Sequence, residues 1–247
     1  MDNFNHELTM NVEIRYGFAD LINDFIGLIF PRICACCGNS LWKHEEIICT
    51  SCNFRLPRTG FHMEADNPAS RTFWGRVEIE NASACFFFNK GNRIQRLMHL
   101  LKYKGRKDIG VFIGEIHGRL LRQAPHYRNA EIILPVPLHK KKLMKRGYNQ
   151  SEQYAIGLAR TMQIPVDPYL LERVHFTETQ TKKSRYGRWQ NVEGLFRVNN
   201  VSKLEGKHVL IVDDVITTGA TLEACISAVS HIPGIRISVA AIAITVC

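Results

Sequence analysis

The sequence predicts an α/β fold, a parallel sheet with helices on both faces, that follows a small cysteine-rich module. Two observations carry this prediction. From about residue 130, nearly continuous apolar runs alternate with segments whose apolar residues recur at helical spacing, as buried parallel strands and their covering helices do. Five of the eight cysteines crowd between residues 34 and 52. We expect residues 1–62 to form the cysteine-rich part and residues 63–247 the α/β domain.

The first predicted element is an amphipathic helix within residues 16–30. Its apolar residues fall at helical spacing: Phe18, Leu21, Ile22, Phe25, Ile26 and Ile29. Because Asp20 and Asp24 interrupt it, the stretch is too short and too charged for a membrane span or a signal peptide. Neither a basic leader nor a small-residue cleavage site accompanies it, so we expect a cytoplasmic protein.

The cysteines form two C-x-x-C pairs, Cys34 with Cys37 and Cys49 with Cys52. Two close pairs suit tetrahedral coordination of Zn²⁺ by four thiolates, and such a closed shell leaves no position for a substrate. We therefore predict a structural zinc site. Cys36 is expected to lie outside the ligand set, because its spacing from Cys34 is too short for the usual knuckle. Two disulfides are the less favoured alternative in a reducing cytosol.

The α/β domain is read from the elements after residue 130. The pattern predicts strands at residues 131–138, 192–198, 208–212 and 236–246, and helices at residues 149–162 and 221–232. Ligands of such domains bind beyond the carboxyl ends of the strands. The residues after the strand at 208–212 are therefore the first place to look for a site.

Two acids and a threonine-rich turn follow that strand. Asp213 and Asp214 suit hydrogen bonds from sugar hydroxyls, or a metal held through water. The turn consists of Thr217, Thr218, Gly219, Ala220 and Thr221. Its amides, its hydroxyls and the following helix N-terminus suit a phosphate. The segment predicts a site for a phosphorylated ribose, and the lack of G-x-G-x-x-G and G-x-x-x-x-G-K-[ST] motifs argues against dinucleotide and Walker-type sites.

The net charge of +9 is unevenly distributed. Residues 93–106, 139–146 and 182–188 are basic and contain no acid, and aromatic residues lie in or beside them. A cationic track with aromatic rings suits single-stranded nucleic acid, whereas the alternatives are a solvated surface and aromatic residues of the core. The candidate nucleic-acid contacts are Lys102, Lys104, Lys140, Lys141, Lys142, Lys145 and Trp189.

Several motifs carry a resemblance to known families. "VLIVDDVITTGAT" closely resembles the phosphoribosyl pyrophosphate (PRPP) signature of type I phosphoribosyltransferases. The two C-x-x-C pairs, "LLKYKG", "PVPLHKKKLMKRGYNQS", "TQTKKSRYGRWQNVEGLF" and this signature, in that order, resemble the ComF family. That family combines a zinc finger with a phosphoribosyltransferase-like domain and is associated with DNA uptake in natural competence. The resemblance implies PRPP with Mg²⁺ as ligand.

The resemblance also assigns roles to individual residues. Arg146 and Gly147 match the position that binds pyrophosphate, and residues 179–191 match the loop that closes over the sugar. The family's R-x-x-N-x-x-G-x-F spacing is met by Arg188, Asn191, Gly194 and Phe196. If the protein is a transferase, the charge of the leaving pyrophosphate is neutralised by one of three candidate catalytic cations, which are Arg146, Lys183 and Arg185.

These observations predict a PRPP-binding protein that handles incoming single-stranded DNA, with an unidentified acceptor if it catalyses phosphoribosyl transfer and with other DNA-uptake proteins as further partners. Two alternatives stay open. One is a sensor in which PRPP changes DNA affinity without turnover. The other is a salvage phosphoribosyltransferase that uses a free nucleobase, although no segment is an obvious hood for that base.

Overall fold

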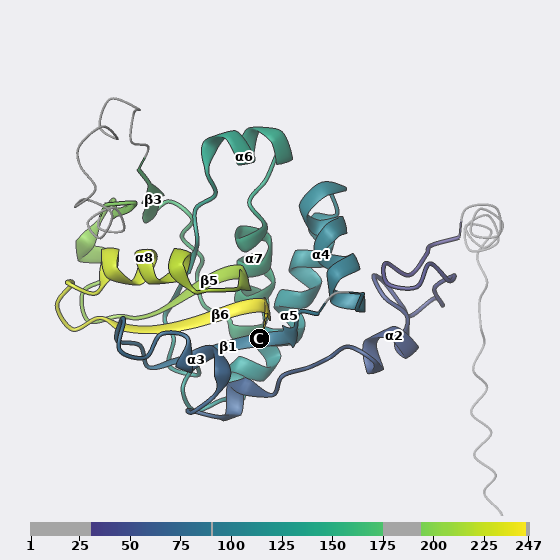
Figure 1. Cartoon of the computed structure of the whole chain (residues 1–247), viewed down its shortest axis with the longest axis horizontal. Coiled ribbons are helices and arrows are strands. Elements are labelled where there is room, and N and C mark those ends of the chain that lie inside the picture. The colour runs from purple at the N-terminus through teal and green to yellow at the C-terminus, as the bar shows by residue number, and fades with distance from the viewer. Residues whose placement is uncertain (1–30, 90, 175–193, 246–247) are drawn as a thin grey trace, which may run out of the picture.

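The centre of the molecule is a four-stranded, fully parallel sheet (Figure 1). The computed structural model describes residues 31–89, 91–174 and 194–245, so the predicted helix within residues 16–30 lies outside the described part. The strands follow the order β1-β6-β5-β2. Their bounds are Asn81–Phe87 for β1, Arg236–Ile244 for β6, His208–Ile216 for β5 and Ile132–Pro135 for β2.

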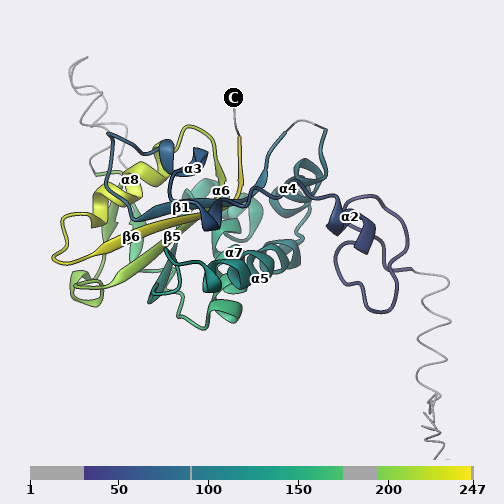
Figure 2. The same cartoon turned by 90° about the horizontal axis from the view of Figure 1, so that it is seen from below.

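Helices cover both faces of this sheet (Figure 2). The helices are α5 (Lys107–Gln123) and α7 (Gln150–Met162) on one face, and α3 (Pro68–Arg71) and α8 (Ala220–Val229) on the other. Leu210 of β5 belongs to the core under α5 and α7, whereas Ile211 belongs to the core under α8. Successive residues of a strand point to opposite faces, so a strand covered on both sides has to be apolar throughout. The predicted fold class is confirmed.

The contact between α5 and α7 is unusually close because glycines face each other. A Cβ atom at Gly114 would lie 2.8 Å from the Cα atom of Gly157, which is closer than real side chains approach. Such a backbone contact leaves no room for the two helices to shift independently. It fixes the position of α7, whose first turn carries part of the site described below.

One predicted strand belongs elsewhere than expected. The pattern at residues 192–198 indicated a strand of the parallel sheet, but β4 (Phe196–Val198) pairs antiparallel with β3 (Leu171–Arg173) in a separate two-stranded sheet. The prediction was wrong about the sheet because the strand has only one buried face. Phe196 packs into the core under α8, while Arg197 is exposed and forms a salt bridge with Glu172 at 2.8 Å.

The cysteine-rich module precedes the sheet and packs on α4 (Arg93–Tyr103). It contains α2 (Thr50–Phe54), and Cys36 and Leu56 share one buried core with Leu97 of α4. The chain then joins the edge of the sheet, where the amide of Phe87 donates to the carbonyl of Pro57 at 2.9 Å. The predicted boundary at residue 62 stays a prediction, but hydrogen bonds to β1 begin before it.

The remaining described elements are short. They are the 3₁₀ turns Phe61–Met63 and Val201–Lys203 and helix α6 (Lys140–Arg146). Among the described residues, no helix is both long enough and apolar enough to span a lipid bilayer.

Candidate ligand and metal sites

The four predicted zinc ligands come together in space. The sulfur atoms of Cys34, Cys37, Cys49 and Cys52 all lie within 4.8 Å of one another. A tetrahedral site with Zn–S bonds of about 2.3 Å places its sulfurs about 3.8 Å apart. The observed separation between the sulfurs of Cys37 and Cys49 is 3.8 Å, and these cysteines form no disulfide. The cluster therefore fits a structural zinc ion.

The surroundings of Cys34 favour its thiolate form. Burial opposes ionisation of Cys34, but hydrogen bonds from nearby amides, including those of Cys36 at 3.4 Å and Cys49 at 3.2 Å, outweigh burial and lower its pKa to about 6. Arg93, the first residue of α4, has a raised pKa because its side chain hydrogen-bonds to the sulfur of Cys52. The α/β domain thus supplies a positive charge to the cysteine cluster.

The acid pair lies in the carboxyl-terminal part of β5, since this strand continues to Ile216 rather than ending at residue 212 as predicted. Asp213 accepts hydrogen bonds from the hydroxyl of Ser151 at 2.9 Å and from the amide of Asp214 at 2.8 Å. Burial and, after it, the charge of Asp214 together raise the pKa of Asp213 to about 7, although these hydrogen bonds oppose the shift. One acid is thus turned inward and held by α7.

The second acid has a different partner. Asp214 forms a salt bridge with Lys102, whose Nζ atom lies 2.9 Å from Oδ2. Both side chains are largely shielded, with 25% of Lys102 and 18% of Asp214 exposed. Lys102 was predicted to contact nucleic acid, but the structure places it against the acid pair.

The threonine-rich turn after β5 borders a small hollow of about 40 Å³ that is lined by Asp213, Val215, Thr217, Thr218, Gly219, Ala220, Thr221 and Leu222. Gly219 has a φ of +76°, and a Cβ atom there would lie 2.7 Å from the side chain of Thr72. Only glycine suits both the backbone angle and this close approach. The exposed threonines and the first turn of α8 leave a polar pocket about large enough for one phosphate group.

The turn is braced from a distant part of the chain. Arg76 donates to the carbonyl of Thr218 at 3.0 Å and forms a salt bridge with Glu223 of α8. It also donates to the carbonyl of Thr72 at 3.0 Å, which ties it to the end of α3. Arg76 therefore holds the phosphate-sized hollow in shape without being part of its lining.

The loop after β2 begins beside the acid pair, because the amide of Val136 donates to the carbonyl of Val212 at 2.9 Å. Asn149, which caps α7, donates to the carbonyl of Val136 at 2.9 Å and closes the base of this loop. The loop carries Arg146 and ends its helix at Gly147, whose φ is +79°. Arg146 lies over the ring of Tyr103 at 5.7 Å, so the predicted pyrophosphate residues contact the end of α4.

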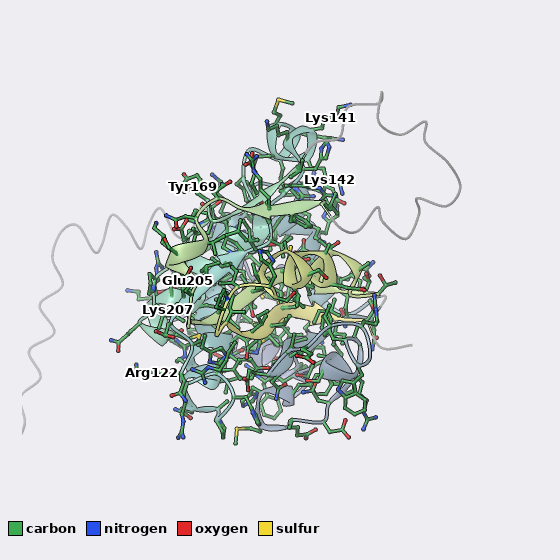
Figure 3. All side chains as sticks on the ribbon, turned by 90° about the vertical axis from the view of Figure 1, so that its left-hand side faces the viewer. Arg122, Lys141, Lys142, Tyr169, Glu205 and Lys207 are labelled. Carbon is green, nitrogen blue, oxygen red and sulfur yellow. The ribbon has the colours of Figure 1, made fainter. Side chains whose placement is uncertain are left out.

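The predicted nucleic-acid residues are divided between these places. Lys140, Lys141, Lys142 and Lys145 are exposed on α6, and Lys104 is exposed after α4. Figure 3 shows Lys141 and Lys142 at the outer end of the molecule, away from the sheet. Lys183, Arg185, Arg188, Trp189, Asn191 and the rest of the predicted loop at residues 179–191 lie outside the described residues.

Two site residues were missed in the sequence. Ser151 is part of the quoted motif "PVPLHKKKLMKRGYNQS", and its place in the first turn of the predicted helix could have marked it. Arg76 gave no signal, because its partners Thr218 and Glu223 are distant in sequence and no motif surrounds it. A pairing between distant residues becomes visible only in the folded chain.

Comparison with known proteins gives a matching domain model and several relatives. Residues 148–243 match the family model described as "Phosphoribosyl transferase domain". The chain is 28% identical over 201 residues to the DNA utilization protein YhgH of Escherichia coli O157:H7, covering 77% of this chain and 80% of that protein. It is 26% identical to Competence protein ComFC of Bacillus subtilis, covering 77% and 75%, and 43% identical to Competence protein F of Haemophilus influenzae over 37% and 41%.

Among solved structures, a glutamine PRPP amidotransferase from B. subtilis, complexed with ADP and GMP, matches with a TM-score of 0.40 and 21% identity. That match covers 58% of this chain and 30% of the amidotransferase. The similarity to relatives named for competence and DNA utilization and the match to the phosphoribosyl transferase domain together support a ComF family protein.

Proposed function

We propose that this protein binds PRPP together with Mg²⁺ at the end of β5 and binds single-stranded DNA along α6 in a DNA-uptake role. The observation that carries the proposal is the acid pair and the phosphate-sized hollow on one continuous segment. Asp213 and Asp214 would accept hydrogen bonds from the ribose hydroxyls, and the turn from Thr217 to Thr221 would hold the 5′-phosphate.

The chemistry at the sugar follows from these positions. The diphosphate on C1′ would extend toward the loop after β2, where Arg146 is held by Tyr103. Bound Mg²⁺ neutralises part of the diphosphate charge. Arg146 would stabilise the same charge, which grows if an acceptor displaces the diphosphate from C1′.

The DNA part of the proposal rests on α6 and on the relatives. None of the α6 residues is buried, and the helix carries five cations on seven residues without an acid. Charge at this density favours a phosphate backbone, whose neutralisation releases counterions. The relatives named for DNA utilization and competence make DNA the polyanion that we propose.

The test of the PRPP site is calorimetric titration with PRPP and MgCl₂. Asp214→Asn should weaken PRPP binding at least tenfold, because a lost hydrogen bond to a charged group costs roughly 1.5 to 3 kcal/mol. Thr218→Val should weaken it as well. Asp167→Asn is the matched control, since Asp167 pairs with Lys203 rather than with residues of the site. Unchanged affinity in both site variants would reject the proposed PRPP site.

A further inference from the structure

The salt bridge between Lys102 and Asp214 joins two predicted sites that were assigned different ligands. Asp214 is expected to accept a ribose hydroxyl, yet its Oδ2 atom lies 2.9 Å from the ammonium group of Lys102. Both side chains are mostly shielded from water, so the pair is screened less than an exposed ion pair. A sugar that takes Asp214 as acceptor has to share it with Lys102 or displace Lys102 from it.

Lys102 is held in place by its neighbours along α4. Leu101 is fully buried, and its carbonyl accepts a hydrogen bond from the hydroxyl of Tyr148. On the other side of Lys102, Tyr103 lies under the guanidinium of Arg146. The last turn of α4 is thus fastened to the loop after β2 on both sides of Lys102. The backbone at Lys102 is therefore held beside the acid pair.

The charges around the acid pair indicate what Lys102 contributes to ligand binding. Two adjacent carboxylates attract sugar hydroxyls but repel a diphosphate carried on the same ring. In PRPP the diphosphate is attached to C1′, one carbon from the hydroxyl on C2′. A cation beside Asp214 is therefore positioned to meet the diphosphate as soon as the sugar hydroxyls engage the acids.

We propose that Lys102 selects sugars that carry a diphosphate on C1′, which rests on the proposed PRPP site. Without ligand, Lys102 neutralises Asp214. When the ribose hydroxyls bind the acids, the ammonium group contacts the diphosphate. Ribose 5-phosphate, which has no group to receive the ammonium, gains nothing from Lys102 and must compete with it for Asp214. The lysine thereby favours PRPP over the sugar phosphate that lacks the diphosphate.

The experiment compares PRPP and ribose 5-phosphate, each titrated calorimetrically with MgCl₂ into three variants and the unmodified chain. Lys102→Met keeps an unbranched apolar stem without the charge. We expect it to weaken PRPP binding at least tenfold and to leave ribose 5-phosphate binding unchanged or tighter. Lys102→Arg keeps the charge and should restore most of the preference for PRPP. Lys207→Met is the control and should change neither affinity, because Lys207 pairs with Glu131 beside the first residue of β5.

The outcomes separate the inference from the function on which it rests. An equal loss of both ligands in Lys102→Met would show that the lysine only maintains the structure of the site, and this would overturn the inference. Unchanged PRPP affinity in Lys102→Met would overturn it too. If the unmodified chain binds neither ligand, the proposed PRPP site fails and the inference falls with it. Thermal unfolding of each variant shows whether a loss of affinity reflects misfolding. If Lys102→Met is misfolded, the preference of Lys102→Arg for PRPP over ribose 5-phosphate tests the inference instead.

Discussion

The hydroxyl of Ser151 donates a hydrogen bond of 2.9 Å to Asp213, which links the first turn of α7 to the carboxyl-terminal part of β5. The two acids of the pair are thereby distinguished. Asp213 is oriented by the hydroxyl of Ser151 in α7, whereas Asp214 is paired with Lys102 of α4. The acid pair is thus held between two helices. A substitution at Ser151 is expected to act on Asp213, and a substitution at Lys102 is expected to act on Asp214.

Ser151→Ala should weaken PRPP binding by about tenfold. The variant removes a hydrogen bond to a charged acceptor, and the carboxylate of Asp213 then lacks the contact that orients it. Calorimetric titration measures the effect. Thr161→Val is a control on the same helix, because the hydroxyl of Thr161 bonds only to backbone carbonyls of its own helix. Equal affinities in Ser151→Ala and the unmodified chain would show that Asp213 needs no support from α7.

Asp213→Asn should stabilise the folded protein more at pH 8 than at pH 5. The pKa of Asp213 is raised from 3.8 to about 7 by burial and by Asp214, so the folded state binds a proton that the unfolded state releases. Stability therefore falls as pH rises through this window and is lowest above pH 7. Asparagine keeps the shape without the buried charge, and each unit of the shift is worth about 1.4 kcal/mol.

Urea unfolding of the variant and the unmodified chain at pH 5 and pH 8 checks this sign. The gain in the free energy of unfolding should be larger at pH 8 than at pH 5 by about 1 to 3 kcal/mol. The same variant should lose PRPP affinity. A constant difference between the two proteins at both pH values would mean that Asp213 does not titrate in this range.

Arg76→Met should weaken PRPP and ribose 5-phosphate by the same factor, several-fold for each. The guanidinium braces the carbonyl of Thr218 and the side chain of Glu223, so its loss loosens the turn that is expected to hold the 5′-phosphate common to both ligands. This shared loss contrasts with the selective loss expected for Lys102→Met. Arg71→Met is a control, because Arg71 pairs with Asp66 instead. A loss confined to PRPP would contradict the bracing role.

Purified protein should contain about one zinc ion per chain, as a single closed shell of four thiolates requires. Cys34→Ser and Cys49→Ser should lose zinc and lower the melting temperature, because the module shares its core with α4. Cys36→Ser should keep the metal, since Cys36 is not among the clustered sulfurs. Metal analysis and thermal unfolding provide the measurements. Full zinc content in both ligand variants would remove the assignment.

Single-stranded DNA should bind with an affinity that falls steeply as salt rises. Replacing Lys140, Lys141 and Lys142 together by Ala should lower the slope of log affinity against log salt by about two to three units, near one per lost phosphate contact. The matched control replaces Arg122, Lys207 and Arg236 by Ala, which removes the same charge. Figure 3 places Arg122 and Lys207 away from α6, and the amide of Arg236 donates to the carbonyl of Lys207. Fluorescence anisotropy measures both. Equal slopes for the two triple variants would indicate attraction to net charge instead of a surface on α6.

The sequence predicted well those parts of the site that are local in the chain. The acid pair, the glycine at φ +76° and the two C-x-x-C pairs each lie within a short segment whose chemistry can be read without the fold. Helix α7 was predicted nearly to its bounds because one side of the helix is buried. The start of β5 was predicted as well, since both faces of the strand are buried there, but the strand continues past residue 212 to Ile216.

The rest depended on contacts between distant segments. Lys102 was grouped with the nucleic-acid residues because a sequence shows its charge but not Asp214 beside it. Strand β4 was placed in the wrong sheet because residues 192–198, a short segment of polar and apolar residues, do not reveal which strand they pair with. Residues 81–123, which form β1, α4 and α5, gave no element at all. Small and polar residues in β1 and glycines in α5 weaken the patterns there, although tertiary packing makes both elements regular.

The glycine contact between α5 and α7 has a consequence for how this protein tolerates mutation. Ser151 is carried by α7, and α7 can approach α5 only where no side chain intervenes. Even an alanine at Gly114 or Gly157 would drive the helices apart and carry the hydroxyl away from Asp213. In a genetic screen for lost function, the inactivating changes should therefore gather at an apolar helix interface that touches no ligand, as well as at the polar residues around the hollow.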